Sequence, residues 1–394
     1  MRVLLFTGKG GVGKTTAAAA TAALAARRGH KTLVLSTDRA HSLADAIGAP
    51  LTAVPTEIDP GLFGVQVDAQ ARFEATWSGV QAWLTGLFAR GGADSLLAEE
   101  LAVLPGADEL MALLEVRDQV AGGQFDVVVV DCAPTAETLR LLALPQALGW
   151  YVERVFPTHR RVVRTMRPML HGLGATEGMP DDAVFEAAAR LHADLAQVQA
   201  LLTDPEITSV RLVLTPESVV VAEARRTYTA LALYGYPVDA VVANRIVPDG
   251  DDPWRAAWAA SQTRQLERVE ESFTGLPVHR APYRATEPIG LAALTEVGEE
   301  LYGDADPLAF SAPAETSTVY ADGDDYVLSM PLPLAEAGDL DLARSGDELI
   351  LTVAGRRRLL ALPSGLRRCA VAGAGLTDGT LRVRFQPDPQ VWPT

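Results

Sequence analysis

A glycine-rich segment near the N-terminus holds the residues of this chain that are best suited to chemistry. Residues 8–16 read GKGGVGKTT and fill every fixed position of a phosphate-binding loop. Its glycines let backbone N–H groups turn toward phosphate oxygens, while Lys14 is placed to hold the β and γ phosphates and Thr15 to ligate Mg²⁺. We therefore expect ATP and Mg²⁺ as cofactors, and ATP hydrolysis. The expected phosphate-binding residues are Gly8, Gly10, Gly11, Val12, Gly13, Lys14, Thr15 and Thr16.

The segments on either side of the loop have the character that this motif requires. Residues 3–6 are an apolar run that predicts a buried strand, and residues 15–28 are an alanine-rich stretch that predicts a helix. The N-terminus of such a helix adds partial positive charge at the phosphate site. A chance glycine-rich turn does not explain this strand, loop and helix together, and we set that reading aside.

Lys9 is a second lysine that an ordinary phosphate loop does not need. Because a short loop cannot easily aim two lysines at one γ phosphate, we expect Lys9 to reach across a dimer interface. There it would stabilise charge that develops on the transferred phosphoryl group. The alternative is a solvated lysine beside an anion site. If Lys9 acts in trans, its replacement by alanine removes turnover and leaves nucleotide affinity largely intact.

Two acidic residues follow predicted strands. Residues 32–36 are apolar and lead to Asp38, and the β-branched run at 125–131 ends in Asp131. The carboxyl ends of strands in open α/β sheets build ligand crevices. We expect Asp38 to orient the attacking water and Asp131 to be linked to Mg²⁺, with a candidate γ-phosphate switch at residues 132–139. For Asp38 alone, a turn or helix cap is the alternative.

Several motifs together resemble the ArsA-type ATPases. They are the two-lysine loop, STDRAHSL at 36–43, PGADE at 105–109 and DCAPT at 131–135. This family contains bacterial arsenite-pump ATPases and the eukaryotic ATPase that targets tail-anchored membrane proteins, within a wider class that includes MinD. The resemblance spans roughly residues 1–305. It implies a P-loop NTPase fold and a homodimer that closes on ATP.

The resemblance also implies roles for individual residues. It makes Lys9 the intermonomer signature lysine, Asp38 the water-polarising acid of the first switch, and Asp131 a metal-linked acid. Asn244 matches the family's adenine-contacting asparagine, and the pair Pro282 and Tyr283 matches its base-side residues. An amide can read the adenine edge and a tyrosine ring can pack on its face. Without the resemblance, a strand-end turn residue and a core aromatic are equally good interpretations.

The chain departs from the family pattern at the switches and at cysteine. Arg39 replaces the usual proline of the first switch, and residues 136–137 are Ala-Glu where a Gly-His pair is usual. The only two cysteines, Cys132 and Cys369, are far apart and form no C-x-x-C. We therefore expect no structural zinc and no three-thiolate arsenite site within one chain.

The pattern of apolar runs predicts two domains. Alternating strands and helices to about residue 302 predict an α/β fold with a doubly wound parallel sheet, interrupted by helical insertions at about 70–122 and 150–205. We place an ATPase domain at 1–305, a linker at 306–317 and a second domain at 318–394. The short alternating runs of the second domain predict a small all-β sandwich that resembles an α-crystallin or small-heat-shock-protein domain.

The helical insertions correspond to the client groove of the tail-anchor-targeting relatives. Their adaptable methionine and aromatic side chains suit a hydrophobic surface, although such a stripe can equally pack on the core. The candidate groove residues are Phe73, Trp77, Val80, Leu84, Leu87, Met166 and Met169.

Composition narrows the class of partner. The 394 residues carry a net charge of −16, which disfavours nucleic acid as a partner. The sequence opens directly on the predicted strand, and no apolar run reaches the ~18 residues of a membrane span. We therefore expect a cytoplasmic protein whose membrane contact, if it has any, is peripheral or through a partner.

These observations favour an ATP-driven dimeric switch that handles a hydrophobic protein client or a membrane-protein partner. One alternative is the ATPase subunit of an arsenite or anion efflux pump, which arsenite stimulation of turnover would support. Another is a MinD-like positioning ATPase on the membrane. That class normally requires an amphipathic C-terminal helix, and the all-β C-terminus speaks against it.

Overall fold

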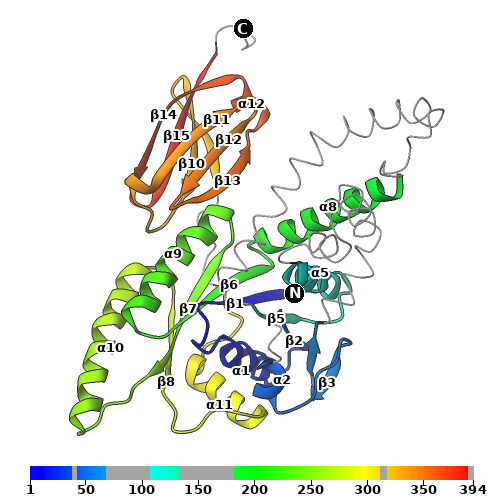
Figure 1. Cartoon of the computed structure of the whole chain (residues 1–394), viewed down its shortest axis with the longest axis vertical. Helices are drawn as coiled ribbons and strands as arrows, with labels where there is room; N and C mark the ends of the chain where they lie inside the picture. The colour runs from blue at the N-terminus through cyan, green and yellow to red at the C-terminus, as the bar shows by residue number, and fades with distance from the viewer. Residues whose placement is uncertain (38–41, 68–106, 133–181, 311–316, 389–394) are drawn as a thin grey trace, which may run out of the picture.

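The computed structural model describes residues 1–37, 42–67, 107–132, 182–310 and 317–388. These residues form one eight-stranded sheet with helices packed on it, and two smaller antiparallel sheets toward the C-terminus (Figure 1). The predicted fold class, an α/β P-loop type followed by a small all-β domain, is confirmed. Among the helices in these ranges, none is long and apolar enough to cross a membrane.

The large sheet has the strand order β3-β4-β2-β5-β1-β6-β7-β8. Every neighbouring pair is parallel except β3 with β4, which form an antiparallel hairpin at one edge. The sheet therefore has the predicted parallel body with one antiparallel edge strand added to it. Its strands are β1 (Arg2–Thr7), β2 (Thr32–Ser36), β3 (Thr56–Asp59), β4 (Leu62–Gln66), β5 (Val127–Asp131), β6 (Thr208–Leu214), β7 (Val238–Ile246) and β8 (Val278–Pro282).

Helices connect and cover these strands. Helix α1 packs on α11 and on strands β2 and β5, whereas α5 packs on α8 and α10 on α9. The helices are α1 (Lys14–Arg27), α2 (Ser42–Ile47), α5 (Ala107–Ala121), α8 (Asp182–Thr203), α9 (Ser218–Tyr234), α10 (Pro253–Ser272) and α11 (Leu291–Tyr302). The small side chains of α1 permit close packing: a Cβ at Gly298 of α11 would lie 2.7 Å from the carbonyl oxygen of Ala20.

The central strands are buried on both faces, which explains their unbroken apolar sequences. In β5, the four valines at 127–130 are at most 1% exposed. A strand covered by helices on both sides has no reason to alternate polar and apolar residues. The strand ends in Asp131, whose side chain is also buried. The fold thus places a buried carboxylate at the carboxyl end of a central strand.

The C-terminal part consists of two facing antiparallel sheets, with orders β14-β15-β10-β9 and β11-β12-β13. Strand β12 alternates buried and half-buried residues, as a strand with one covered face should. The elements are β9 (Thr318–Asp322), β10 (Asp325–Pro331), η2 (Ala337–Asp339), β11 (Leu340–Ser345), β12 (Glu348–Val353), β13 (Arg356–Ala361), α12 (Ser364–Arg367), β14 (Cys369–Thr377) and β15 (Thr380–Pro387).

The sandwich contacts the C-terminal half of α9. Thr229 donates a hydrogen bond of 2.7 Å to the carbonyl oxygen of Pro333, and the Arg358 guanidinium donates to the carbonyl oxygen of Leu233. A cation at the carboxyl end of a helix complements its unpaired carbonyl groups and its dipole. Burial lowers the pKa of Arg358, and Tyr236 and Tyr234 oppose that shift.

Candidate nucleotide-binding site

The phosphate loop connects β1 to α1, where the parallel strands of the sheet end. A Cβ atom at Gly8 would come within 2.1 Å of the carbonyl oxygen of Val213 on β6. Gly13 precedes α1 in the left-handed conformation, with φ 93°, and a Cβ there would lie 2.2 Å from Nδ2 of Asn244. Glycine is therefore required at both positions.

The Lys14 side chain is hydrogen-bonded to the backbone of the phosphate loop. It is the first residue of α1, its side chain is buried, and its Nζ donates a 3.3 Å hydrogen bond to the carbonyl oxygen of Lys9. The positive charge is thereby kept beside the loop rather than in solvent, which suits binding of anionic phosphate oxygens.

Lys9 extends toward a different partner. Its Nζ lies 3.8 Å from Oε2 of Glu223 on α9, and its side chain is 40% exposed. One loop thus carries two ammonium groups with separate surroundings: Lys14 is buried against the loop and Lys9 reaches to the surface. Glu223 was not predicted as a neighbour of Lys9.

Oxygen atoms from four elements, α1, α2, β2 and β5, meet beside the loop. Thr15 Oγ1 donates a 2.8 Å hydrogen bond to Oδ2 of Asp131, and it lies 3.3 Å from Oγ of Ser42. Ser36 Oγ lies 3.2 Å from the same carboxylate oxygen. Hydroxyl and carboxylate oxygens form the hard ligand set that Mg²⁺ prefers, so these residues fit that ion. Neither serine was predicted as part of the site.

The segment that leads to Asp38, at the start of the first switch, also contacts Asp131. The backbone N–H of Thr37 donates a 2.9 Å hydrogen bond to the carbonyl oxygen of Asp131. Asp38, predicted to orient water, lies outside the described residues, as do the candidate switch after Cys132 and the seven candidate groove residues. Their roles stay predictions.

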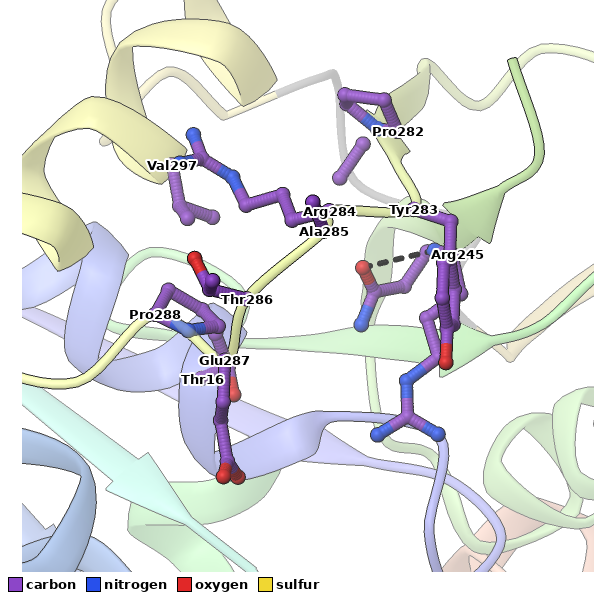
Figure 2. Close-up of a pocket in the computed structure, with 12 residues that line it drawn as sticks. Thr16, Arg245, Pro282, Tyr283, Arg284, Ala285, Thr286, Glu287, Pro288 and Val297 are labelled. Carbon is purple, nitrogen blue, oxygen red and sulfur yellow. Dashed lines mark hydrogen bonds between the residues drawn. The ribbon is translucent and has the colours of Figure 1, made fainter.

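A cavity of about 310 Å³ begins at α1 and ends at the loop after β8. Figure 2 shows its lining, with Thr16, Glu287 and Pro288 on one side and Tyr283 on the other. The three predicted base-site residues Asn244, Pro282 and Tyr283 all line it. The remaining lining residues are Arg245, Ala281, Arg284, Ala285, Thr286 and Val297.

Asn244 connects this cavity to the phosphate loop. Its Nδ2 donates a 2.9 Å hydrogen bond to the carbonyl oxygen of Val12, and its Oδ1 accepts one of 2.9 Å from the N–H of Arg245. An amide has two donor hydrogens and two acceptor lone pairs, so one of each is still available to a ligand. The Tyr283 side chain is exposed and can cover the face of a base.

Comparison with known proteins agrees with this geometry. Residues 1–303 match the family model described as "Anion-transporting ATPase", of the ArsA ATPase family. This chain belongs to the ArsA ATPase family. Residues 323–385 match a second model, described as an HSP20-like domain found in ArsA, which agrees with the sandwich. The predicted family resemblance and the predicted ATPase activity are therefore confirmed.

Some relatives match the chain over nearly its full length and others over about three quarters of it. It is 34% identical over 394 residues to the putative arsenical pump-driving ATPase of Chlorobaculum tepidum, covering 99% of this chain and 97% of that one. It is 32% identical over 379 residues to the putative arsenical pump-driving ATPase 1 of Aquifex aeolicus, covering 93% and 95%. It is 30% identical over 319 residues to ATPase GET3B of Arabidopsis thaliana, covering 75% and 77%.

Both cysteines of this ArsA-family chain are buried. Burial, followed by the charge of Asp131, raises the pKa of the Cys132 thiol to about 12. A thiol in that state is a poor nucleophile and a poor soft-metal ligand, because thiolate is the reactive form. Cys132 therefore acts as a small core residue beside the site.

Proposed function

We propose that the chain binds MgATP with the triphosphate in the loop at residues 8–16 and the adenine in the cavity that ends at Tyr283. The contact between Thr15 and Asp131 carries this proposal, because it places a hydroxyl and a buried carboxylate together beside the phosphate loop. Mg²⁺, when bound there, would neutralise charge on the phosphates. Lys14 would hold the β and γ phosphates, and Asp38 would orient the attacking water.

We further propose that the active unit is a homodimer. Lys9 supports this, since its side chain leaves the loop for the surface and pairs with Glu223 instead of joining Lys14. To act on the γ phosphate bound by a partner, Lys9 would release Glu223 and cross the interface. It would then stabilise the charge of the transferred phosphoryl group, as an arginine finger does.

The proposed outcome of hydrolysis is the handling of a hydrophobic protein client or membrane-protein partner. Its support is the sequence likeness to ATPase GET3B, together with the methionine and aromatic residues of the predicted insertions. Adaptable side chains of this kind suit varied apolar segments.

A second candidate is the ATPase subunit of an arsenite or anion efflux pump, since relatives over the full length carry the name putative arsenical pump-driving ATPase. The cysteines argue against a thiolate site for the metalloid. The chain has only two, and both are buried.

Steady-state ATP hydrolysis separates these candidates. Wild type and Asp38→Asn are each titrated with a detergent-free hydrophobic helical peptide and, separately, with arsenite. Client handling predicts that the peptide alone changes turnover and that Asp38→Asn has no turnover to change. Stimulation by arsenite alone would replace this proposal with the pump.

A further inference from the structure

The pairing of strand β7 with β8 is irregular beside the cavity. Its register with β8 shifts between Ala243 and Ile246, and Arg245, inside that interval, has a left-handed backbone with φ 57°. Residues that carry a Cβ adopt this conformation rarely, so the surrounding contacts must hold it in place. Irregularities of this kind next to active sites redirect a side chain.

Both backbone polar groups of Arg245 are held by amide side chains. Asn244 Oδ1 accepts from its N–H at 2.9 Å, and Gln262 Nε2 on α10 donates to its carbonyl oxygen at 3.1 Å. Gln262 is only 4% exposed, and its Oε1 accepts a 2.7 Å hydrogen bond from the N–H of Val247. A buried glutamine thus links Arg245, inside the irregular interval, to Val247, just after it, and holds the Arg245 backbone in place.

Among the residues that the structure describes, the Arg245 side chain is the cation of this cavity without an acidic partner. Arg284 lines the same cavity, but its guanidinium lies 3.5 Å from Glu296 and 2.9 Å from Glu300. Arg245 makes no ion pair with any residue in the described ranges. In Figure 2 its side chain lies on the Tyr283 side of the cavity.

The position of Arg245 favours the phosphate end of a ligand. The preceding residue, Asn244, is hydrogen-bonded to Val12 of the phosphate loop, so this turn is joined directly to that loop. A guanidinium is permanently charged and can only donate hydrogen bonds, and its strongest partners are anionic oxygens. The phosphates are the anionic groups of a nucleotide.

We propose that Arg245 is a nucleotide-binding residue that donates hydrogen bonds to phosphate oxygens of the bound nucleotide, and that Gln262 positions it. This inference rests on the proposed function, in which a nucleotide occupies this cavity. It assigns the recognition of charge to a residue outside the phosphate loop, and it leaves the base to Asn244 and Tyr283.

The test is calorimetric binding of ATP, ADP and adenosine to the full chain, as wild type, Arg245→Gly and Arg245→Lys. Glycine accepts the left-handed backbone without strain, so Arg245→Gly removes the guanidinium and keeps the turn. We expect ATP and ADP to bind roughly tenfold or more weakly, because a charge-assisted hydrogen bond is lost. Adenosine affinity should be unchanged, and Arg245→Lys should restore part of the loss.

Equal weakening of adenosine, or no weakening of any ligand, would overturn the proposal. Arg280→Gln is the matched control, since this exposed arginine pairs with Glu270 and does not line the cavity. If wild type itself fails to bind ATP, the proposed function fails. If wild type binds ATP and Arg245→Gly binds it equally well, only this inference fails.

A double-mutant cycle tests the part played by Gln262. Gln262→Leu should weaken ATP binding in the same ligand-selective way, and adding it to Arg245→Gly should cause no further loss. Losses that add would show that Gln262 acts independently of Arg245. If Gln262→Leu does not fold by circular dichroism, Gln262→Glu replaces it in the cycle.

Discussion

The two ends of the proposed nucleotide site are built in different ways. The phosphate end comes mainly from one short segment between β1 and α1, fixed by approaches as close as that of Gly13 to Asn244. The base end is assembled from Asn244 of β7 and from the loop after β8, and its aromatic residue, Tyr283, is 56% exposed.

The sequence is more constrained at the phosphate end than at the base end. At the phosphate end the shape of the backbone is the binding surface, so a single added methyl group disturbs it. At the base end separate side chains form the surface, and removing one leaves the others in place. We therefore expect substitutions to cause large losses of activity at the phosphate end and smaller losses of affinity at the base end.

Gly13→Ala should have the largest effect. The new Cβ would lie 2.2 Å from Asn244 Nδ2 at a backbone φ of 93°, so the loop and the asparagine must both move. Displacement of this size is expected to reduce kcat/KM for ATP by about 10²-fold or more. Gly10→Ala is the control for folding, because nothing lies within 4 Å of its Cβ position. An unchanged kcat/KM in Gly13→Ala would contradict the account of the loop.

Thr15→Val should come next. Valine keeps the shape of the side chain and removes the hydroxyl that contacts Asp131. We expect Mg²⁺-dependent turnover to fall by about 10²-fold, since a bound metal supplies several kcal/mol of charge stabilisation. Thr15→Ser should keep most of the activity. Equal activity of Thr15→Val and Thr15→Ser, measured across a Mg²⁺ titration, would exclude Thr15 as a ligand.

Tyr283→Ala should have a smaller effect, confined to affinity. Stacking of a base on an aromatic ring contributes about 1–3 kcal/mol, so the Kd for ATP should rise roughly tenfold with kcat little changed. Tyr283→Phe keeps the ring and should bind ATP like wild type. A fall in kcat as large as that in Thr15→Val would remove the distinction between the two ends.

The smallest effect is expected for alkylation of the Cys132 thiol, which lies beside the phosphate end. Since burial raises the pKa of Cys132 to about 12, the thiolate fraction at pH 8 is on the order of 10⁻⁴. Native protein treated with iodoacetamide at pH 8 should therefore stay unmodified at Cys132, as read by mass spectrometry. The same treatment in denaturant should label both cysteines. Rapid native labelling of Cys132 would mean that this end opens readily.

Much of the fold was predictable because burial on both faces leaves a plain sequence signal. The strand at 32–36 has the predicted ends. Strand β14 was missed because alanine and glycine dominate Cys369–Thr377 and have low strand propensity. The hairpin of β3 and β4 was also missed, and it is the antiparallel departure from the predicted sheet.

The residues of the site also differ in how far they could be predicted from the sequence. The phosphate loop was predictable because its determinants are consecutive in the chain. Arg245, Gln262 and Glu223 were not, because their significance depends on a register shift and on contacts of helices α10 and α9 with a strand and with the phosphate loop. No spacing in a single sequence encodes a register shift between two strands.

Catalysis in trans by Lys9 is tested most directly by mixing two inactive variants. Lys9→Ala keeps its own phosphate site but offers no lysine to a partner, whereas Lys14→Ala does the reverse. Random pairing should give heterodimers with one complete site, so an equimolar mixture should regain about a quarter of wild-type ATPase activity. A mixture no more active than the two variants measured separately would contradict the account.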